Sequence, residues 1–128
     1  MDDKVLFWWN RHPCSKGLTP EAPREIANRL ELVSVETGEE IHRSDQPISS
    51  ILFIIKGRLK HTLFDQYGRM AEQTFLTGGS QFGILAAAQE EIVPLEVVAM
   101  EPSTFLKLGF QEALSLSSRF PEFQLNLF

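Results

Sequence analysis

The chain has 128 residues, of which 43% are hydrophobic and 23% charged, and its formal net charge at pH 7 is -5. This length suits one domain, and the composition is that of a globular protein rather than a disordered one. The basic residues are scattered among acidic ones, which excludes direct nucleic-acid binding by this chain and adsorption to anionic lipid. We therefore expect a single domain over residues 1–128 that contacts neither nucleic acid nor membrane.

The cellular location is inferred from the N-terminal residues and the cysteine. No apolar run approaches the roughly 18 residues of a membrane span. The apolar run at residues 5–9 is short and follows two aspartates, unlike a secretory signal. The only cysteine, Cys14, has no partner for an internal disulfide, which fits a reducing compartment. These features predict a cytoplasmic protein.

The first expected helices lie in an N-terminal arm, residues 1–18, and just after it. Trp8 and Trp9 are interpreted as anchors of a helix, with an exposed partner surface as the alternative. Thr19-Pro20-Glu21 then offers a helix N-cap, although Pro23 could move the start two or three residues on. Ile26, Ala27 and Leu30 would line one face of this helix.

Beyond residue 32 the pattern changes to β-strands separated by turn signals. Short strands at close spacing are typical of an all-β sandwich or barrel rather than of βαβ units. The run 51–55 lacks polar alternation, so both of its faces should be covered, as in a central strand. We predict strands over residues 33–35, 40–43, 51–56, 58–64, 70–76, 95–100 and 104–108.

The C-terminal part, residues 109–128, is predicted to be helical. Phe110, Ala113, Leu114 and Ser117 share one helical face, and Pro121 interrupts the pattern. The apolar segment 123–128 suggests either that the chain is a module of a longer protein or that a partner covers this end. Phe120, Phe123 and Phe128 are accordingly predicted as interface residues.

Glycines lead into a short helix-favouring run between two predicted strands. A glycine turn before a helix offers amide groups and a positive dipole end to a phosphate or carboxylate. Glycine turns also precede many helices for purely structural reasons, without binding a ligand. The segment reads Gly78-Gly79-Ser80-Gln81-Phe82-Gly83-Ile84-Leu85-Ala86-Ala87-Ala88.

The order of the predicted helix, strands, turns and glycine motifs over residues 19–121 resembles that of the cyclic nucleotide-binding domain family. The resemblance implies a mainly β fold, an eight-stranded antiparallel jelly-roll β-barrel (double-stranded β-helix) with flanking N- and C-terminal helices. It divides the chain into the arm 1–18, a helix plus β-roll at 19–108 and C-terminal helices at 109–128. It rests on Gly38-Glu39-Glu40-Ile41, the stretch 51–60, Tyr67-Gly68, Gly79, Phe82-Gly83 and Val97-Val98-Ala99.

The family's phosphate-binding cassette holds the cyclic nucleotide through a glutamate, an arginine and a threonine. An ungapped alignment places Ile84, Val93 and Glu96 at those three positions, so the polar contacts are replaced. Losing a bidentate arginine and the glutamate would cost about a hundredfold or more in affinity. The resemblance assigns the ligand site to Gly79, Phe82, Gly83, Ile84, Leu85, Ala86, Val93, Pro94, Leu95 and Glu96.

From the resemblance and these replacements we expect a non-catalytic regulatory module with a degenerate cassette. It would need no cofactor, would not bind cAMP or cGMP in the usual way, and would signal through its C-terminal helices to an effector domain or protein partner. The alternatives are genuine cyclic nucleotide binding through unusual contacts and a ligand-free dimerisation module, for instance a homodimer.

Other chemistry is sparse in the sequence. His12, His42 and His61 are far apart and are interpreted as solvated or strand-surface residues, so no metal site is expected. The alternative for His12-Pro13-Cys14 is haem ligation, as in some gas-sensing relatives of this fold. Glu90-Glu91 is interpreted as a solvated loop, or alternatively as a gate against anions. No activated nucleophile or catalytic carboxylate pair is apparent, which predicts that the chain is not an enzyme.

Overall fold

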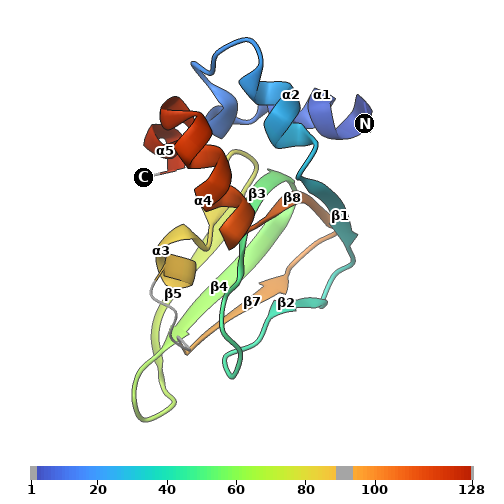
Figure 1. The fold of residues 1–128 in the computed structure, drawn as a ribbon. Helices are drawn as coiled ribbons and strands as arrows, with labels where there is room; N and C mark the ends of the chain where they lie inside the picture. Colours follow the sequence, from blue (N-terminus) through green and yellow to red (C-terminus); the bar gives the residue numbers. More distant parts are fainter. Residues whose placement is uncertain (1–2, 89–93, 128) are drawn as a thin grey trace.

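The computed structural model describes residues 3–88 and 94–127, apart from the side chains of Leu85 and Ala86 (Figure 1). The helices are α1 (Asp3–Arg11), the 3-10 turn η1 (Pro13–Ser15), α2 (Ala22–Ala27), α3 (Ile84–Ala88), α4 (Phe110–Arg119) and α5 (Pro121–Leu127). The strands are β1 (Glu31–Val35), β2 (Glu40–His42), β3 (Ser50–Lys56), β4 (Arg58–Phe64), β5 (Met70–Thr77), β6 (Gln81–Phe82), β7 (Leu95–Ala99) and β8 (Ser103–Gly109).

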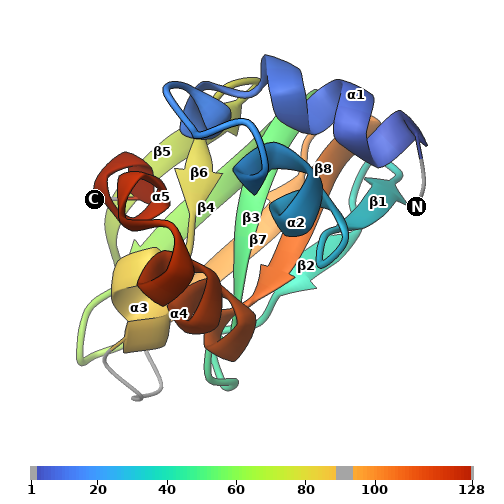
Figure 2. The same cartoon turned by 45° about the horizontal axis from the view of Figure 1, so that its top comes forward.

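The strands form two four-stranded antiparallel sheets. One has the order β1-β8-β3-β6 and the other β2-β7-β4-β5. The helices gather on the first sheet, while β4, β5, β7 and β2 lie on the other side of the sandwich (Figure 2). The mainly β fold with eight strands and flanking helices is therefore confirmed. The paired strands among the described residues give two sheets and not a closed barrel.

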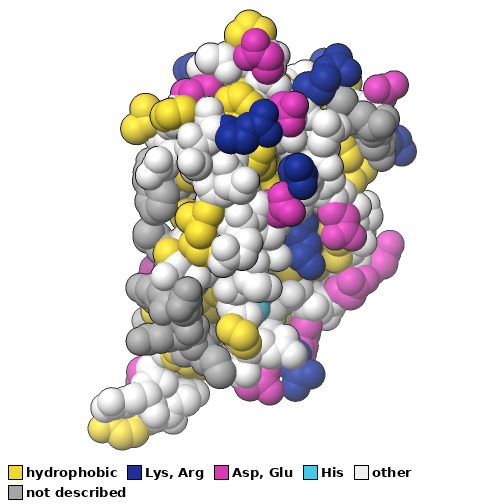
Figure 3. All heavy atoms as spheres, viewed as in Figure 1, with side chains coloured by type: hydrophobic (Ala, Val, Ile, Leu, Met, Phe, Trp, Pro, Cys, Tyr) yellow, Lys and Arg dark blue, Asp and Glu magenta, His cyan; other side chains and the backbone are white. Residues whose placement is uncertain are grey.

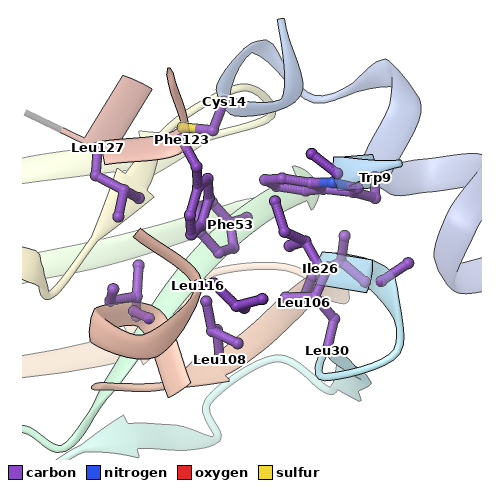
Figure 4. Packing of buried hydrophobic residues seen from close by; sticks show 14 of the residues in the cluster. Trp9, Cys14, Ile26, Leu30, Phe53, Leu106, Leu108, Leu116, Phe123 and Leu127 are labelled. Atoms are coloured by element: carbon purple, nitrogen blue, oxygen red, sulfur yellow. The ribbon is translucent and has the colours of Figure 1, made fainter. Parts of the chain in front are cut away.

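Two hydrophobic clusters occupy the two faces of the first sheet. The helix-facing cluster lies between that sheet and the helices, and the inter-sheet cluster lies between the two sheets. The helix-facing cluster contains Val5, Trp9, Cys14, Ala22, Ile26, Ala27, Leu30, Ile51, Phe53, Ile84, Leu106, Leu108, Ala113, Leu116, Phe120, Phe123 and Leu127 (Figure 4). The inter-sheet cluster contains Val35, Ile48, Leu52, Ile54, Leu59, Ala87, Leu95, Val97, Ala99 and Phe105.

Strand β3 explains why its sequence lacks polar alternation. Ile51 and Phe53 belong to the helix-facing cluster, while Leu52 and Ile54 belong to the inter-sheet cluster. Successive side chains of a strand point to opposite faces, so both faces of β3 are buried. The prediction of a central strand is confirmed, since β3 pairs with both β8 and β6.

The two tryptophans of α1 have different environments. Trp9 is fully buried in the helix-facing cluster, where its ring lies edge-on to Phe53 at a centroid distance of 5.0 Å. Trp8 is only half-buried, beside the exposed Phe7. The anchoring interpretation therefore holds for Trp9.

Helix α2 begins at Ala22, as expected if Pro23 moves the start two or three residues on, but Thr19 is not its N-cap and no side chain caps it. Thr19 bonds elsewhere: its backbone N–H and its hydroxyl both donate to the carboxylate of Glu122 in α5, at 3.3 and 3.0 Å. Pro23 occupies the first turn of the helix, where a missing N–H costs no hydrogen bond.

The C-terminal helices also differ in part from the sequence expectation. The buried residues of α4 are Ala113 and Leu116, whereas Leu114 is 50% exposed. Phe120 and Phe123 are buried within this chain rather than offered to a partner, because α5 folds back onto the helix-facing cluster. Phe128 lies outside the described residues.

The face of the protein seen in Figure 3 carries interspersed acidic and basic side chains. Its ion pairs are exposed, for example Arg29 with Glu112 at 3.3 Å and Arg119 with Glu25 at 3.4 Å, and pairs of this kind contribute little stability each. None of the described helices combines the length and the apolar character that a membrane crossing requires.

Candidate functional site

The cassette predicted from the sequence begins at the turn between β5 and β6. Gly79 lies in this turn with a φ of 94°, and Phe82 pairs with Leu52 across β6 and β3. Gly83, with a φ of 107°, then leads into α3, whose first residue is Ile84. The predicted order of turn, glycine and short helix is present.

The remaining cassette residues are spread over different environments. Leu85 and Ala86 belong to α3, and Val93, Glu90 and Glu91 lie outside the described residues. Pro94 is exposed, and its carbonyl accepts a hydrogen bond from the N–H of Phe64 at 2.8 Å.

Strand β7 separates the last two predicted site residues. Leu95 is buried in the inter-sheet cluster, together with Val97 and Ala99. Glu96 alternates with them, so it lies on the outer face of its sheet and is directed away from the space between the sheets. The structure thus does not place Glu96 beside Leu95 in one pocket.

Amide groups of the glycine turn are already used within the protein. The N–H of Gly79 donates to the carbonyl of Ile54 at 2.9 Å, and the N–H of Ser80 donates to the carbonyl of Thr77 at 3.0 Å. In return the carbonyl of Ser80 accepts from the N–H of Ile54 at 2.9 Å. Neither amide is therefore available to an anion, contrary to what the glycine pattern suggested.

Close packing explains two of these glycines. A Cβ atom at Gly83 would lie 2.5 Å from the carbonyl oxygen of Ser50, and one at Gly78 would lie 2.6 Å from that of Ile55. Both distances are shorter than real Cβ contacts allow. The segment needs glycine so that its backbone can approach β3, independently of any ligand.

His61, expected from the sequence to be a solvated or strand-surface residue, is a further site candidate. It is half-buried, its ring lies 5.5 Å from that of Phe82, and its Nδ1 is 3.5 Å from the hydroxyl of Thr74. The signal for this position was the alternation of β4, because His61 shares a face with the buried Leu59. His61 thus faces the cassette from the opposite sheet.

A cavity of about 420 Å³ opens between the two sheets and reaches Phe82. Its volume is within the range of small-molecule sites. Apolar side chains of both sheets line it together with three glutamates, one histidine and one lysine. The lining residues are Glu31, Val33, Val35, Glu39, Glu40, Ile41, His42, Gln46, Pro47, Ile48, Ser49, Ser50, Leu52, Phe82, Phe105 and Lys107.

The charges around this cavity are mainly negative. Glu31, Glu39 and Glu40 line it against Lys107, the one lysine or arginine in its described lining. Such a lining disfavours a ligand phosphate. His42 adds a buried Nε2 atom without a hydrogen-bond partner, and burial lowers the pKa of His42 while a backbone hydrogen bond to Gln46 opposes the shift.

Ile84 faces the C-terminal helices. It is buried in the helix-facing cluster and lines an apolar cavity of about 280 Å³ between α3, α4 and α5. Ala113 and Leu127 line the same cavity. Ile84 therefore joins α3 to the C-terminal helices by apolar packing.

His12 and Cys14 are buried, with the exposed Pro13 between them, so the expectation of a solvated His12 is wrong. Both ring nitrogens of His12 take part in hydrogen bonds, one with the N–H of Cys14 and one with the carbonyl of Ser80, each at 3.1 Å. His12 thus has no free nitrogen for haem iron in this arrangement. Among the described residues, no three His, Cys, Asp or Glu side chains are grouped to hold a metal ion.

Comparison with solved structures shows the fold. A Thermus thermophilus catabolite activator protein is 22% identical with a TM-score of 0.78, and the match covers 90% of this chain and 54% of that one. The regulatory subunit of a cAMP-independent protein kinase A from Trypanosoma brucei is 18% identical with a TM-score of 0.81, over 91% of this chain and 43% of that one.

A Trypanosoma cruzi regulatory subunit of the same description, bound to guanosine, is 18% identical with a TM-score of 0.80, over 91% of this chain and 42% of that one. The chain thus spans about half the length of these three structures. Among curated proteins, none matches this sequence. The family model described as "Cyclic nucleotide-binding domain" matches residues 32–120, well over half of the chain. The chain therefore belongs to the cyclic nucleotide-binding domain family.

Proposed function

We propose that this chain is a non-catalytic regulatory module that does not bind cAMP or cGMP in the usual way of its family. In this proposal it signals through α4 and α5 to an effector domain or protein. The observation that carries the proposal is Ile84, an apolar residue at the family's glutamate position that is buried against the C-terminal helices. An isoleucine side chain has no hydrogen-bonding group for a ribose hydroxyl.

The charge of the inter-sheet cavity supports the same proposal. A cyclic phosphate placed near Glu31, Glu39 and Glu40 would meet repulsion. Lys107 of the lining would oppose it, as would Arg43, which is paired with Glu40 at 3.9 Å. A ligand without a phosphate group suits this lining better. The Trypanosoma cruzi regulatory subunit, described as bound to guanosine, supports an uncharged nucleoside as the first ligand class to test.

Signalling through the C-terminal helices is supported by the packing of α3 on α4 and by exposed leucines. Leu114 is 50% exposed and Leu125 is 78% exposed, so both helices offer apolar surface to a partner. A ligand would shift the arrangement of these helices only if it bound the two arrangements with different affinities. Ile84 of α3 packs against α4 and α5, so a ligand that moved α3 would change the packing of these two helices through this side chain.

Isothermal titration of the full chain with cAMP, cGMP and guanosine tests the ligand part of the proposal. We expect no cAMP or cGMP binding at low-micromolar concentration, and such binding would overturn the proposal. The double variant Ile84→Glu and Val93→Arg supplies the family's two polar side chains and should strengthen cAMP binding about a hundredfold. Because Ile84 is buried against the C-terminal helices, circular dichroism must first show that this variant is folded. The matched control is Ile84→Leu, which keeps the apolar packing and should not bind cAMP.

A ligand-free dimerisation module is the second candidate, favoured by the internal hydrogen bonds of Gly79 and Ser80. A thermal-shift screen separates the two, because a ligand that binds only the folded state raises the melting temperature. If no nucleoside, anion or apolar compound raises it, and the chain sediments as a dimer, the second candidate is supported instead.

A further inference from the structure

The N-terminal segment reaches the start of the cassette through His12. This residue follows α1 and is 5% exposed, and its ring is stacked on Trp9 at 6.2 Å and lies edge-on to Phe53 at 5.4 Å. Its Nε2 is 3.1 Å from the carbonyl oxygen of Ser80, the residue directly before β6. One side chain of the arm thus touches the turn that leads into β6 and α3.

The hydrogen bonds determine which nitrogen of His12 carries the proton. The backbone N–H of Cys14 donates to Nδ1 at 3.1 Å, so Nδ1 is an acceptor and carries no proton. The proton of the neutral ring is therefore on Nε2, which donates to the carbonyl of Ser80. Both nitrogens are satisfied only in this neutral tautomer.

We propose that neutral His12 is a positioning residue for the Gly79–Ser80 turn, and that protonation of its ring releases the N-terminal segment from this turn. No ligand takes part in this contact, so it exists whether or not the cavity is occupied. The Ser80 carbonyl also accepts from the N–H of Ile54 in β3, so the arm and the central strand share one acceptor in this turn.

Protonation would remove the present geometry in two ways. A proton on Nδ1 would face the N–H of Cys14, so the acceptor that caps η1 would be lost. The positive charge would also be buried between Trp9 and Phe53, away from water. The bond from Nε2 to Ser80 favours the charged ring but is the smaller effect, since burial is the main cause that lowers the pKa of His12.

The charged and titratable groups around His12 are few among the described residues. Arg11 lines the same hollow as His12 and would repel a positive ring. On η1 the neighbour is Cys14, whose thiol is neutral at physiological pH because burial raises its pKa to about 11. Glu122 of α5 is partly exposed, and its carboxylate accepts from Thr19. Phe53 of β3 and Gly79 and Ser80 of the turn have uncharged side chains.

The sign of the pH dependence follows from the lowered pKa. The released arm has an ordinary histidine with a pKa near 6.5 and therefore binds more protons than the docked arm. Docking is fully stabilised above about pH 6.5 and weakens as the pH falls. The ratio of docked to released arm should fall by up to about tenfold per pH unit, until the docked pKa is reached.

Release of the arm would also weaken the packing of α5. The side-chain amide of Asn126 donates to the carbonyls of Cys14 and Lys16, at 2.8 and 2.7 Å. These are the hydrogen bonds by which α5 holds η1 from the other side. A displaced η1 would therefore loosen the last helix, so one protonation event would act on both the cassette turn and α5.

Trp9 fluorescence in the full chain provides the test. In the variant Trp8→Phe, Trp9 is the only tryptophan, and its buried ring should emit at short wavelength at about pH 8 and shift to longer wavelength towards about pH 5. Circular dichroism recorded on the same samples shows that the sheets stay folded. The hydrogen-exchange protection factors of residues 76–83, corrected for the slower intrinsic exchange at low pH, should decrease over the same pH range.

The matched variant is Trp8→Phe with His12→Gln. Glutamine has no titratable group and can still donate to the Ser80 carbonyl, so the emission of Trp9 should no longer change over this range. A second control, Trp8→Phe with His42→Gln, should keep the transition. The same transition with His12→Gln, or no transition with His12 intact, would overturn the proposal.

Histidine-ring NMR gives an answer even if acid loosens the whole protein. We expect His12 to show the Nε2–H tautomer and a titration midpoint below that of a free histidine. An Nδ1–H tautomer, or an ordinary midpoint in the folded protein, would contradict the proposed role.

Discussion

The side-chain amide of Gln81 donates to the main-chain carbonyl of Leu127 at 2.9 Å. The first residue lies in β6, immediately before the cassette helix, and the second lies at the end of α5. Together with the buried Ile84, this hydrogen bond gives the cassette a second direct contact with the C-terminal helices. The start of the cassette and the last helix therefore share a polar contact as well as an apolar one.

Two substitutions of Gln81 should have different effects. Gln81→Glu replaces the donor by a carboxylate facing the Leu127 carbonyl and should destabilise the protein by about 1 to 3 kcal/mol. Gln81→Leu removes the bond but also removes a buried oxygen that has no partner, so its effect on stability should be small. Urea unfolding measures both, and hydrogen exchange of α5 shows whether the loss is local. Equal destabilisation by the two would contradict this account.

Gly83→Ala should be strongly destabilising. Its Cβ would meet the Ser50 carbonyl oxygen at 2.5 Å, and its φ of 107° is strained for any L-residue. We expect a loss of about 2 to 4 kcal/mol in the free energy of unfolding. Gly68→Ala is the control, because Gly68 also has a positive φ but no heavy atom within 4 Å of the added Cβ. That variant should lose about 1 kcal/mol, and the comparison isolates the steric clash.

Cys14 should be unreactive in the folded protein. Burial raises the pKa of its thiol to about 11, so only about one thiol in a thousand is a thiolate near pH 8. Reaction with a disulfide reagent should therefore be slow in buffer and fast in urea. Rapid labelling of the native protein would show that the arm opens readily.

His42 should make stability pH-dependent independently of His12. Burial lowers the pKa of His42 below its unfolded value, so the unfolded chain binds more protons and stability falls as the pH drops below about 6.5. In the His12→Gln variant, the urea midpoint should still decrease between about pH 7.5 and about pH 5.5. Adding His42→Gln should flatten this remaining slope.

Much of the fold could be predicted from strand alternation. The observed strands overlap all seven predicted segments. A half-buried strand has alternating apolar and polar residues and a fully buried strand has a continuous apolar run, so both can be recognised in the sequence. β6 was not predicted as a strand, because it has only two residues and depends on pairing with Leu52 and Phe53 rather than on its own pattern.

The site was less predictable than the fold. The glycine pattern located the turn correctly but did not reveal that Gly79 and Ser80 bond to the neighbouring backbone, which depends on a contact with β3. His12 gave no sign of burial, because its surroundings come from segments as distant as Phe53 and Ser80. The negatively charged cavity likewise combines residues of β1, β2 and β8 that share no local motif.

Strand β3 has side chains in both hydrophobic clusters, Ile51 and Phe53 on one face and Leu52 and Ile54 on the other. Neither cluster can therefore lose its packing without removing half of the contacts of this strand. We expect the helices and the sheets to unfold together in one cooperative transition, without a stable intermediate that keeps only one cluster. The backbone amides of β3 should then be the last to exchange with solvent, at a rate set by global unfolding.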